Sequence, residues 1–144
     1  MNKIIIINGP NLNLLGKRQE SVYGKKSFDD IYSDLKNFAS KNKIELSYFQ
    51  SNSEGAIIDK LHQCIGDCDL VILNAGALTH YSYSLHDAIL ATKLPVIEVH
   101  ISNIYTREDW RRKSVITPAA IGIVCGFGTD VYKIALFAAI NYLG

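Results

Sequence analysis

Residues 4–24 read IIIINGPNLNLLGKRQESVYG, an apolar run followed by a long, largely polar connection. The four isoleucines of residues 4–7 show no polar alternation, which indicates a strand that is buried on both faces. A helix-start signal follows at Ser27, so Asn8 to Gly24 forms a strand-to-helix connection. Such connections usually have about two to six residues, and one this long is either functional or disordered. Its aliphatic side chains need a place to pack, which favours a functional loop.

Strand and helix signals alternate along the rest of the chain. Apolar residues recur at helical spacing after Ser27, where Asp30 completes a capping-box pattern. A second helix is expected from Ser53, with an inward face of Ile57, Ile58, Leu61, Cys64 and Ile65. The remaining expected elements are strands at residues 44–49, 69–73, 95–99 and 121–125, a helix that stops near Lys93, and a closing helix from Thr129 to Leu143. The closing helix is apolar nearly all round, so we expect it to be either deeply buried or shared with another subunit.

The alternation predicts an α/β protein with three layers and a five-stranded parallel sheet, because short strands joined through helices cross over in the right-handed sense. In such sheets, ligands bind outside the carboxyl ends of the strands, where the strand order reverses. With the flavodoxin-like order 2-1-3-4-5, the loops after strands one, three and four share one crevice. These loops, residues 11–23, 74–80 and 100–112, carry the unusual polar residues of the chain.

Composition and charge narrow the range of partners. The chain has 144 residues, of which 48% are hydrophobic, and this fits one domain over residues 1–144. The net charge of +1 gives no general attraction to nucleic acid or to a membrane surface. We find no signal-like segment, and no apolar run approaches the roughly 18 residues of a membrane span. We therefore expect a cytoplasmic protein that binds neither nucleic acid nor membrane.

The three cysteines, Cys64, Cys68 and Cys125, lack the even, dense spacing of a disulfide framework. A metal site with His62 is disfavoured, because His62 and Cys64 are two residues apart and would point to different faces of one helix. We expect ordinary buried thiols and no metal.

Two side-chain pairs in the crevice loops suit proton transfer. Arg18 beside Tyr23 would favour the phenolate, which is a competent base once it is desolvated. The alternative is that Tyr23 packs while Arg18 is solvated. Glu98 and His100 are two apart on a strand and share a face, so the carboxylate can hold the imidazole in one tautomer. The alternative for this pair is a surface ion pair at the fraying end of the strand.

Further polar groups in the same loops suit substrate binding. Asn74 directly follows a buried strand, where its amide can orient a carboxylate or a hydroxyl group. Ile101 and Ser102 can add backbone N–H donors for an anion. His80 and Asp87 are seven residues apart, two turns of a helix, and are either a hydroxyl-binding pair or exposed polar residues.

The arginines of the connection that follows His100 are less well specified by the sequence. Arg111 faces inward only if the segment that begins at Arg107 is helical. Arg112 and Lys113 are expected to stay in water.

Several functions are disfavoured by missing motifs. The sequence has no G-x-G-x-x-G, no phosphate-binding G-x-x-x-x-G-K-[ST] and no G-x-S-x-G nucleophile elbow. Asn8 and Asn74 stand where a phosphoacceptor receiver domain has acidic residues. A flavin- or nucleotide-binding module would need a phosphate-cradling loop after the first strand, and a purely structural oligomer would leave the crevice loops without a purpose.

Taken together, the motifs of this chain closely resemble those of type II 3-dehydroquinate dehydratases. They are NGPNLNLLG at residues 8–16, Arg18, YG at residues 23–24, NAGALTH at 74–80, EVHISN at 98–103 and REDWRR at 107–112. The resemblance extends from Asn8 through the closing helix. It implies a cofactor-free, flavodoxin-like lyase, commonly a dodecamer built as a tetramer of trimers, that converts 3-dehydroquinate to 3-dehydroshikimate in the shikimate pathway or in quinate breakdown.

The resemblance also implies roles for individual residues. In catalysis, Tyr23 removes a proton from C2, Arg18 keeps Tyr23 ionised, Asn11 stabilises an enolate-like intermediate, and His100 protonates the departing C1 hydroxyl while Glu98 orients it. In substrate binding, Asn74, Ile101 and Ser102 hold the carboxylate, and His80, Arg111 and Asp87, the last across a subunit boundary, contact the ring hydroxyls.

These implied roles agree with the chemistry, because elimination of water from a β-hydroxy ketone needs a base, an acid and a group that holds negative charge on the carbonyl oxygen. Gly16 and Gly24 bracket Arg18 and Tyr23, so we expect this segment to act as a lid. Glu20 stands where the family usually has proline, which adds backbone freedom and a carboxylate near Arg18.

Overall fold

The computed structural model describes residues 1–17 and 25–144. The expectations for Arg18, Glu20 and Tyr23 lie outside the described residues. Strands and helices alternate in the order β1 (Asn2–Asn8), α2 (Phe28–Lys41), β2 (Ile44–Gln50), α3 (Glu54–Cys64), β3 (Leu70–Asn74), α4 (Tyr83–Thr92), β4 (Val96–His100), β5 (Gly122–Cys125) and α5 (Asp130–Leu143).

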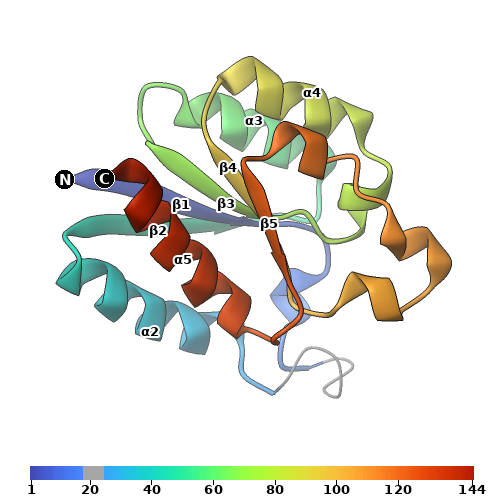
Figure 1. Ribbon diagram of the computed structural model, residues 1–144, viewed down its shortest axis with the longest axis horizontal. Coiled ribbons are helices and arrows are strands. Elements are labelled where there is room, and N and C mark those ends of the chain that lie inside the picture. Colours follow the sequence, from blue (N-terminus) through green and yellow to red (C-terminus); the bar gives the residue numbers. More distant parts are fainter. Residues whose placement is uncertain (18–24) are drawn as a thin grey trace.

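The five strands form one sheet in the order β2-β1-β3-β4-β5, and every neighbouring pair is parallel. Figure 1 shows α2 and α5 on one face of this sheet and α3 and α4 on the other. The predicted three-layer, flavodoxin-like architecture and the strand order 2-1-3-4-5 are therefore confirmed. The order reverses between β1 and β3, and these two strands end side by side at Asn8 and Asn74.

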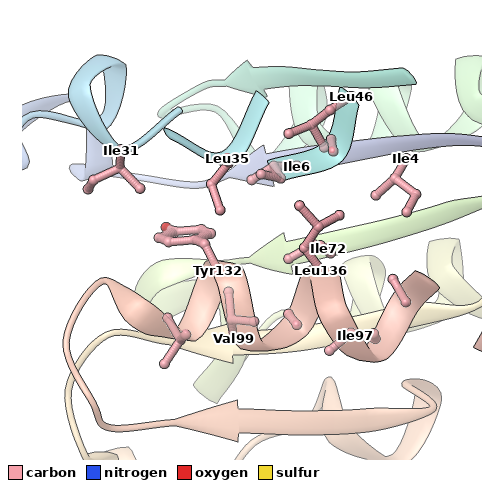
Figure 2. Close-up of a cluster of buried hydrophobic side chains, with 14 of the residues drawn as sticks. Ile4, Ile6, Ile31, Leu35, Leu46, Ile72, Ile97, Val99, Tyr132 and Leu136 are labelled. Atoms are coloured by element: carbon pink, nitrogen blue, oxygen red, sulfur yellow. The ribbon is translucent and has the colours of Figure 1, made fainter. Parts of the chain in front are cut away.

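The isoleucine run of β1 contributes to both hydrophobic layers. Ile4 and Ile6 pack in the layer beneath α2 and α5, and Figure 2 shows them near Leu136 of α5. Ile5 and Ile7 pack in the opposite layer, beneath α3 and α4. All four are almost completely buried, and each contributes about 1.5–3 kcal/mol by removal from water. Burial on both faces explains why the run shows no alternation.

The helix starts follow the predicted caps. Ser27 accepts a hydrogen bond from the backbone N–H of Asp30 and forms a full capping box with it. Ser53 caps α3 in the same way through Ala56. The expectation that Ile65 lies on the inward face of α3 is wrong, because the helix ends at Cys64 and the extended backbone at Ile65 leaves its side chain 54% exposed.

The closing helix α5 is buried on one side only. Val131, Tyr132, Ala135, Leu136 and Ala139 lie in the core, whereas its outer face exposes further apolar residues, notably Ile134 and Phe137. Complete burial of this helix within the chain is therefore excluded, and the shared-subunit alternative stays a prediction.

Residues 1–17 and 25–144 contain neither a helix suited to span a membrane nor a cluster of metal ligands. No helix in this part of the chain is long and apolar enough to cross a membrane. The same residues contain no group of three or more His, Cys, Asp and Glu side chains placed to hold a metal ion. The cysteines are free thiols, with Cys64 buried and the other two partly buried.

Candidate active site

A pocket opens at the carboxyl ends of β1, β3 and β4, where the predicted crevice lies. Seven of the predicted site residues line it: Asn11, Asn74, His80, His100, Ile101, Ser102 and Arg111. The three loops thus meet as expected from the strand order. The described residues that line the pocket include two arginines, Arg107 and Arg111, and no carboxylate, although both arginines also form ion pairs with Glu108 outside the lining. The pocket therefore suits a small anion.

The loop after β1 lies directly against the loop after β3. The backbone N–H of Gly9 donates to the carbonyl oxygen of Asn74 at 2.7 Å, and a Cβ at Gly9 would lie 2.7 Å from the carbonyl oxygen of Ala75. Asn11 then adopts a left-handed backbone conformation with φ of 71°, which asparagine tolerates better than most residues. Its N–H donates to Oδ1 of Asn52 at 2.9 Å. These contacts hold Asn11 at the edge of the pocket.

Glu98 and His100 form the polar centre of the site. Nε2 of His100 lies 2.5 Å from Oε2 of Glu98, and the two residues are 6% and 0% exposed. Because a carboxylate only accepts hydrogen bonds, Nε2 carries the hydrogen and Nδ1 is the other ring nitrogen available to a ligand. The alternative of a surface ion pair at a fraying strand end is wrong.

Three hydroxyl groups complete the surroundings of Glu98. Thr79 and Ser114 each donate to Oε2 at 2.8 Å, and Thr117 donates to Oε1 at 2.5 Å. Burial by itself raises the pKa of the Glu98 carboxyl. The hydrogen bond and charge of His100, together with the hydroxyl donors, outweigh burial and bring that pKa below its ordinary value. Glu98 is therefore an anion.

The tautomer of His80 is set by a hydrogen bond to the backbone. Its Nδ1 lies 2.7 Å from the carbonyl oxygen of Lys113, so Nδ1 carries the hydrogen and Nε2 is the acceptor. Burial lowers the pKa of His80, and the charges of His100 and Arg111 lower it further, against the hydrogen bond to Lys113. The ring centroids of His80 and His100 are 6.3 Å apart. A neutral His80 can therefore accept a hydrogen bond from a ligand hydroxyl beside His100.

Asn74 is tied to the protein at both ends of its amide. Its Oδ1 accepts from the N–H of Gly76 at 3.2 Å, and its Nδ2 donates to the hydroxyl of Tyr132 at 2.9 Å. An amide nitrogen has two hydrogens, so one N–H of Asn74 is left over for the pocket that it lines.

The two pocket arginines come from the connection between β4 and β5. The segment Asp109–Arg112 is a short 3-10 helix, and Arg111 faces inward with 18% of its side chain exposed. The expectation that a helix would begin at Arg107 is therefore wrong by two residues, because the backbone at Arg107 is extended, but Arg111 does lie in a short helix and faces inward. Arg107 also lines the pocket, and its Nη1 donates to Oγ of Ser102 at 3.1 Å. Arg112 and Lys113 are exposed, as expected.

Comparisons with known proteins identify the family. The family model described as Dehydroquinase class II matches residues 2–140. A 3-dehydroquinate dehydratase of Caldicellulosiruptor bescii is 52% identical over 139 residues, which cover 96% of each chain. The chain belongs to the class II dehydroquinase family.

Solved class II dehydroquinases share the whole architecture. The type II dehydroquinase of Butyrivibrio crossotus matches with a TM-score of 0.93 at 39% identity, covering 97% of both chains. That of Propionibacterium acnes matches with a TM-score of 0.94 at 33% identity, covering 98% of this chain and 97% of the other. The resemblance found in the sequence motifs is confirmed.

Not every predicted site residue reaches the pocket of this dehydroquinase chain. Glu98 lies behind His100 and acts on the pocket only through it. Asp87 is exposed on α4 and does not line the pocket. The interpretation that His80 and Asp87 share one helix is wrong, because His80 ends a separate 3-10 helix, Gly76–His80, and α4 begins only at Tyr83.

Several residues that shape the site were missed from the sequence. Arg107 was named only as the start of a segment, although REDWRR is one of the dehydroquinase-like motifs that could have drawn attention to it. Of the three hydroxyl donors to Glu98, Thr79 falls within the NAGALTH motif, whereas Ser114, Thr117 and the phenol of Tyr132 have no periodic or motif signal.

Proposed function

We propose that this crevice eliminates water from 3-dehydroquinate to give 3-dehydroshikimate in the shikimate or quinate pathway, with no cofactor. The observation that carries the proposal is the buried Glu98–His100 pair, whose imidazole lines a pocket with two arginines and no carboxylate among its described lining residues. This arrangement offers an acid beside a site for an anion, which the elimination of hydroxide requires.

In the proposed reaction, a base takes a proton from C2, next to the ketone, and the electron pair of that C–H bond moves toward the carbonyl oxygen as an enolate. The electrons then return to form the C1–C2 double bond as the C–O bond at C1 breaks, in an anti β-elimination. His100 gives its Nδ1 proton to the departing hydroxyl, which leaves as water. The negative charge of Glu98 stabilises the imidazolium before this transfer and holds the ring in place.

Binding of the substrate uses the remaining groups of the pocket. Asn74 offers its second amide hydrogen to the substrate carboxylate, together with the backbone N–H groups of Ile101 and Ser102. Arg111 adds positive charge and contacts the ring hydroxyls. Neutral His80 accepts from a ring hydroxyl through Nε2. We propose that Asp87 completes this hydroxyl contact across a subunit boundary, because it lies outside the pocket of its own chain.

The roles of Tyr23, Arg18 and Asn11 rest on the family resemblance. Tyr23 is proposed as the base, Arg18 as the cation that keeps its phenolate ionised, and Asn11 as the group that stabilises the enolate oxygen. Only Asn11 falls within the described residues, and it lines the pocket. Replacement of Tyr23 by Phe should remove nearly all turnover while leaving substrate binding measurable, and an unchanged rate would clear Tyr23 of this role.

We also propose that the working enzyme is a cytoplasmic homododecamer, a tetramer of trimers, in which each chain forms one catalytic domain over residues 1–144. The apolar outer face of α5, with Ile134 and Phe137 exposed, is consistent with burial between subunits. A mass measurement in solution tests the assembly.

Formation of a conjugated enone tests the proposed reaction. Purified protein mixed with 3-dehydroquinate in the presence of a chelator should produce the ultraviolet absorbance of the enone. Treatment with borohydride in the presence of substrate should leave the protein active, because the mechanism forms no imine with a lysine. Folded protein that gives no enone signal would end the proposal, and a yellow purified protein would favour the flavin-binding alternative.

A further inference from the structure

Tyr132 places a phenol at the centre of the core beneath the active site. It is 0% exposed, and its ring packs edge-on against Phe28 with centroids 5.1 Å apart. Figure 2 shows it projecting from α5 into the layer between that helix and the sheet. Its hydroxyl reaches the carboxyl ends of β1 and β3, where it meets Asn8 and Asn74. The catalytic roles proposed above make no use of this group.

The hydrogen bonds around Tyr132 have a fixed direction. The backbone N–H of Gly76 can only donate, so the amide end of Asn74 that it contacts is the oxygen. The nitrogen of Asn74 therefore faces Tyr132, whose hydroxyl accepts from it at 2.9 Å. The phenol proton is then free to donate to Oδ1 of Asn8 at 2.8 Å. The contact with Gly76 thus identifies the two ends of the Asn74 amide, and the hydrogen bond to Tyr132 is the second anchor that holds this amide.

We propose that Tyr132 is a positioning residue that fixes the amide of Asn74, so that the second N–H of Asn74 points into the crevice toward the substrate carboxylate. This inference rests on the proposed function. Asn74 lines the pocket, whereas Tyr132 and Asn8 do not, so Tyr132 acts on the substrate only through Asn74. Among the described residues, the hydroxyl of Tyr132 and Oδ1 of Asn8 have no other hydrogen-bond partner, and Nδ2 of Asn8 is buried without any partner.

The phenol is suited to this role because it stays neutral. Burial raises the pKa of Tyr132 far above its ordinary value, although the hydrogen bonds with Asn74 and Asn8 oppose this. An uncharged hydroxyl both accepts from one amide and donates to the other at every working pH. Its effect on binding should therefore not vary with pH, in contrast to that of a titrating group.

Replacement of Tyr132 by Phe keeps the ring and removes the hydroxyl. The KM for 3-dehydroquinate should rise about tenfold, the value of one hydrogen bond to a charged group, while kcat stays near wild type. Tyr32→Phe is the matched control, because Tyr32 packs against the same core and its hydroxyl donates to the carbonyl oxygen of Leu46 at 2.9 Å, away from the crevice. Equal KM values in the two variants would overturn the inference.

A double-mutant cycle separates a role through Asn74 from a general effect on the fold. Asn74→Ala should itself raise KM, and Tyr132→Phe should then add no further increase. If the increase in KM of the double variant is the product of the increases in the two single variants, the substitutions act independently and a positioning role is contradicted. If Tyr132→Phe is unstable, Asn8→Ala removes the acceptor that holds the phenol and leaves the aromatic core intact; a several-fold increase in KM supports the inference, and an unchanged KM overturns it.

A crystal structure of Tyr132→Phe gives a readout that does not depend on turnover. The Asn74 side chain should lose its hydrogen bond to Gly76 or occupy more than one rotamer, whereas an unchanged, single rotamer would overturn the inference. A wild-type protein with no enone activity would defeat the proposed function, and this structure would still decide whether Tyr132 orients Asn74.

Discussion

Glu98 accepts a hydrogen bond of 2.5 Å from His100, and both side chains are almost wholly buried at the carboxyl end of β4. A buried carboxylate is costly unless it is paired and hydrogen-bonded. Here four donors, the imidazole and three hydroxyls, surround it. The arrangement retains a negative charge directly behind the proposed acid.

Glu98→Gln removes that charge and keeps the size of the side chain. The amide cannot stabilise the imidazolium, so kcat for enone formation should fall about a hundredfold, in the range of general acid catalysis, with little change in KM. Steady-state kinetics measure both constants. Glu45→Gln, at an exposed position on β2, is the control and should behave as wild type. A wild-type kcat in Glu98→Gln would contradict the role of Glu98.

Thr117→Val tests the hydroxyl donors that lower the pKa of Glu98. Valine has the shape of threonine but cannot donate, so the pKa of Glu98 should rise and the acid limb of the kcat–pH profile should move to higher pH. Thr92→Val is the control, because it is the same substitution at a buried threonine that donates to the carbonyl oxygen of Ile89 within α4. An acid limb at the same pH in both variants would show that Thr117 has no electrostatic effect.

The stability of the fold should depend on pH through the same carboxyl. The pKa of Glu98 in the folded chain lies below its ordinary value of 4.5, so the stabilisation is present above that value and is lost as the pH falls through the folded pKa. Chemical denaturation of wild type and Glu98→Gln at a series of pH values measures this. The free energy of unfolding of wild type should exceed that of Glu98→Gln by less and less as the pH falls below 4.5. A difference in this free energy that stays constant across the acid range would be inconsistent with a lowered pKa.

Gly9→Ala tests the close approach of the loops after β1 and β3. The added Cβ would lie 2.7 Å from the backbone oxygen of Ala75, so the two loops must separate at a cost of about 1–3 kcal/mol in the free energy of unfolding. Gly55→Ala is the control, because its Cβ meets nothing closer than 3.8 Å and alanine favours the helix α3. If both variants unfold at the same denaturant concentration, the loop contact does not constrain the site.

The sequence predicted the fold well because its signals are local and periodic. The isoleucine run and the capping box at Ser27 depend only on neighbouring residues, and both occur as expected. Ile65 was misplaced because a helical pattern does not mark the residue at which the helix ends. His80 and Asp87 were placed on one helix because a spacing of seven residues cannot show the break between His80 and α4.

Site residues could be predicted from the sequence where they lie together on one strand or within one motif. Glu98 and His100 share a face of β4 because of the two-residue period of a strand. The donors to Glu98 come from the 3-10 helix Gly76–His80, which holds Thr79, and from the connection before β5, which holds Ser114 and Thr117; Tyr132 lies in a helix with an apolar sequence. Such contacts arise only from tertiary packing, which no pattern in the chain encodes locally.

The most direct test of the account is the initial rate of enone formation from 3-dehydroquinate, measured side by side for wild type and His100→Asn. Wild type should turn the substrate over without any added cofactor. The folded variant should lose at least about a hundredfold in kcat, because no proton donor then faces the departing hydroxyl. A variant as fast as wild type, or a folded wild type that forms no enone, would contradict the proposed dehydration at this site.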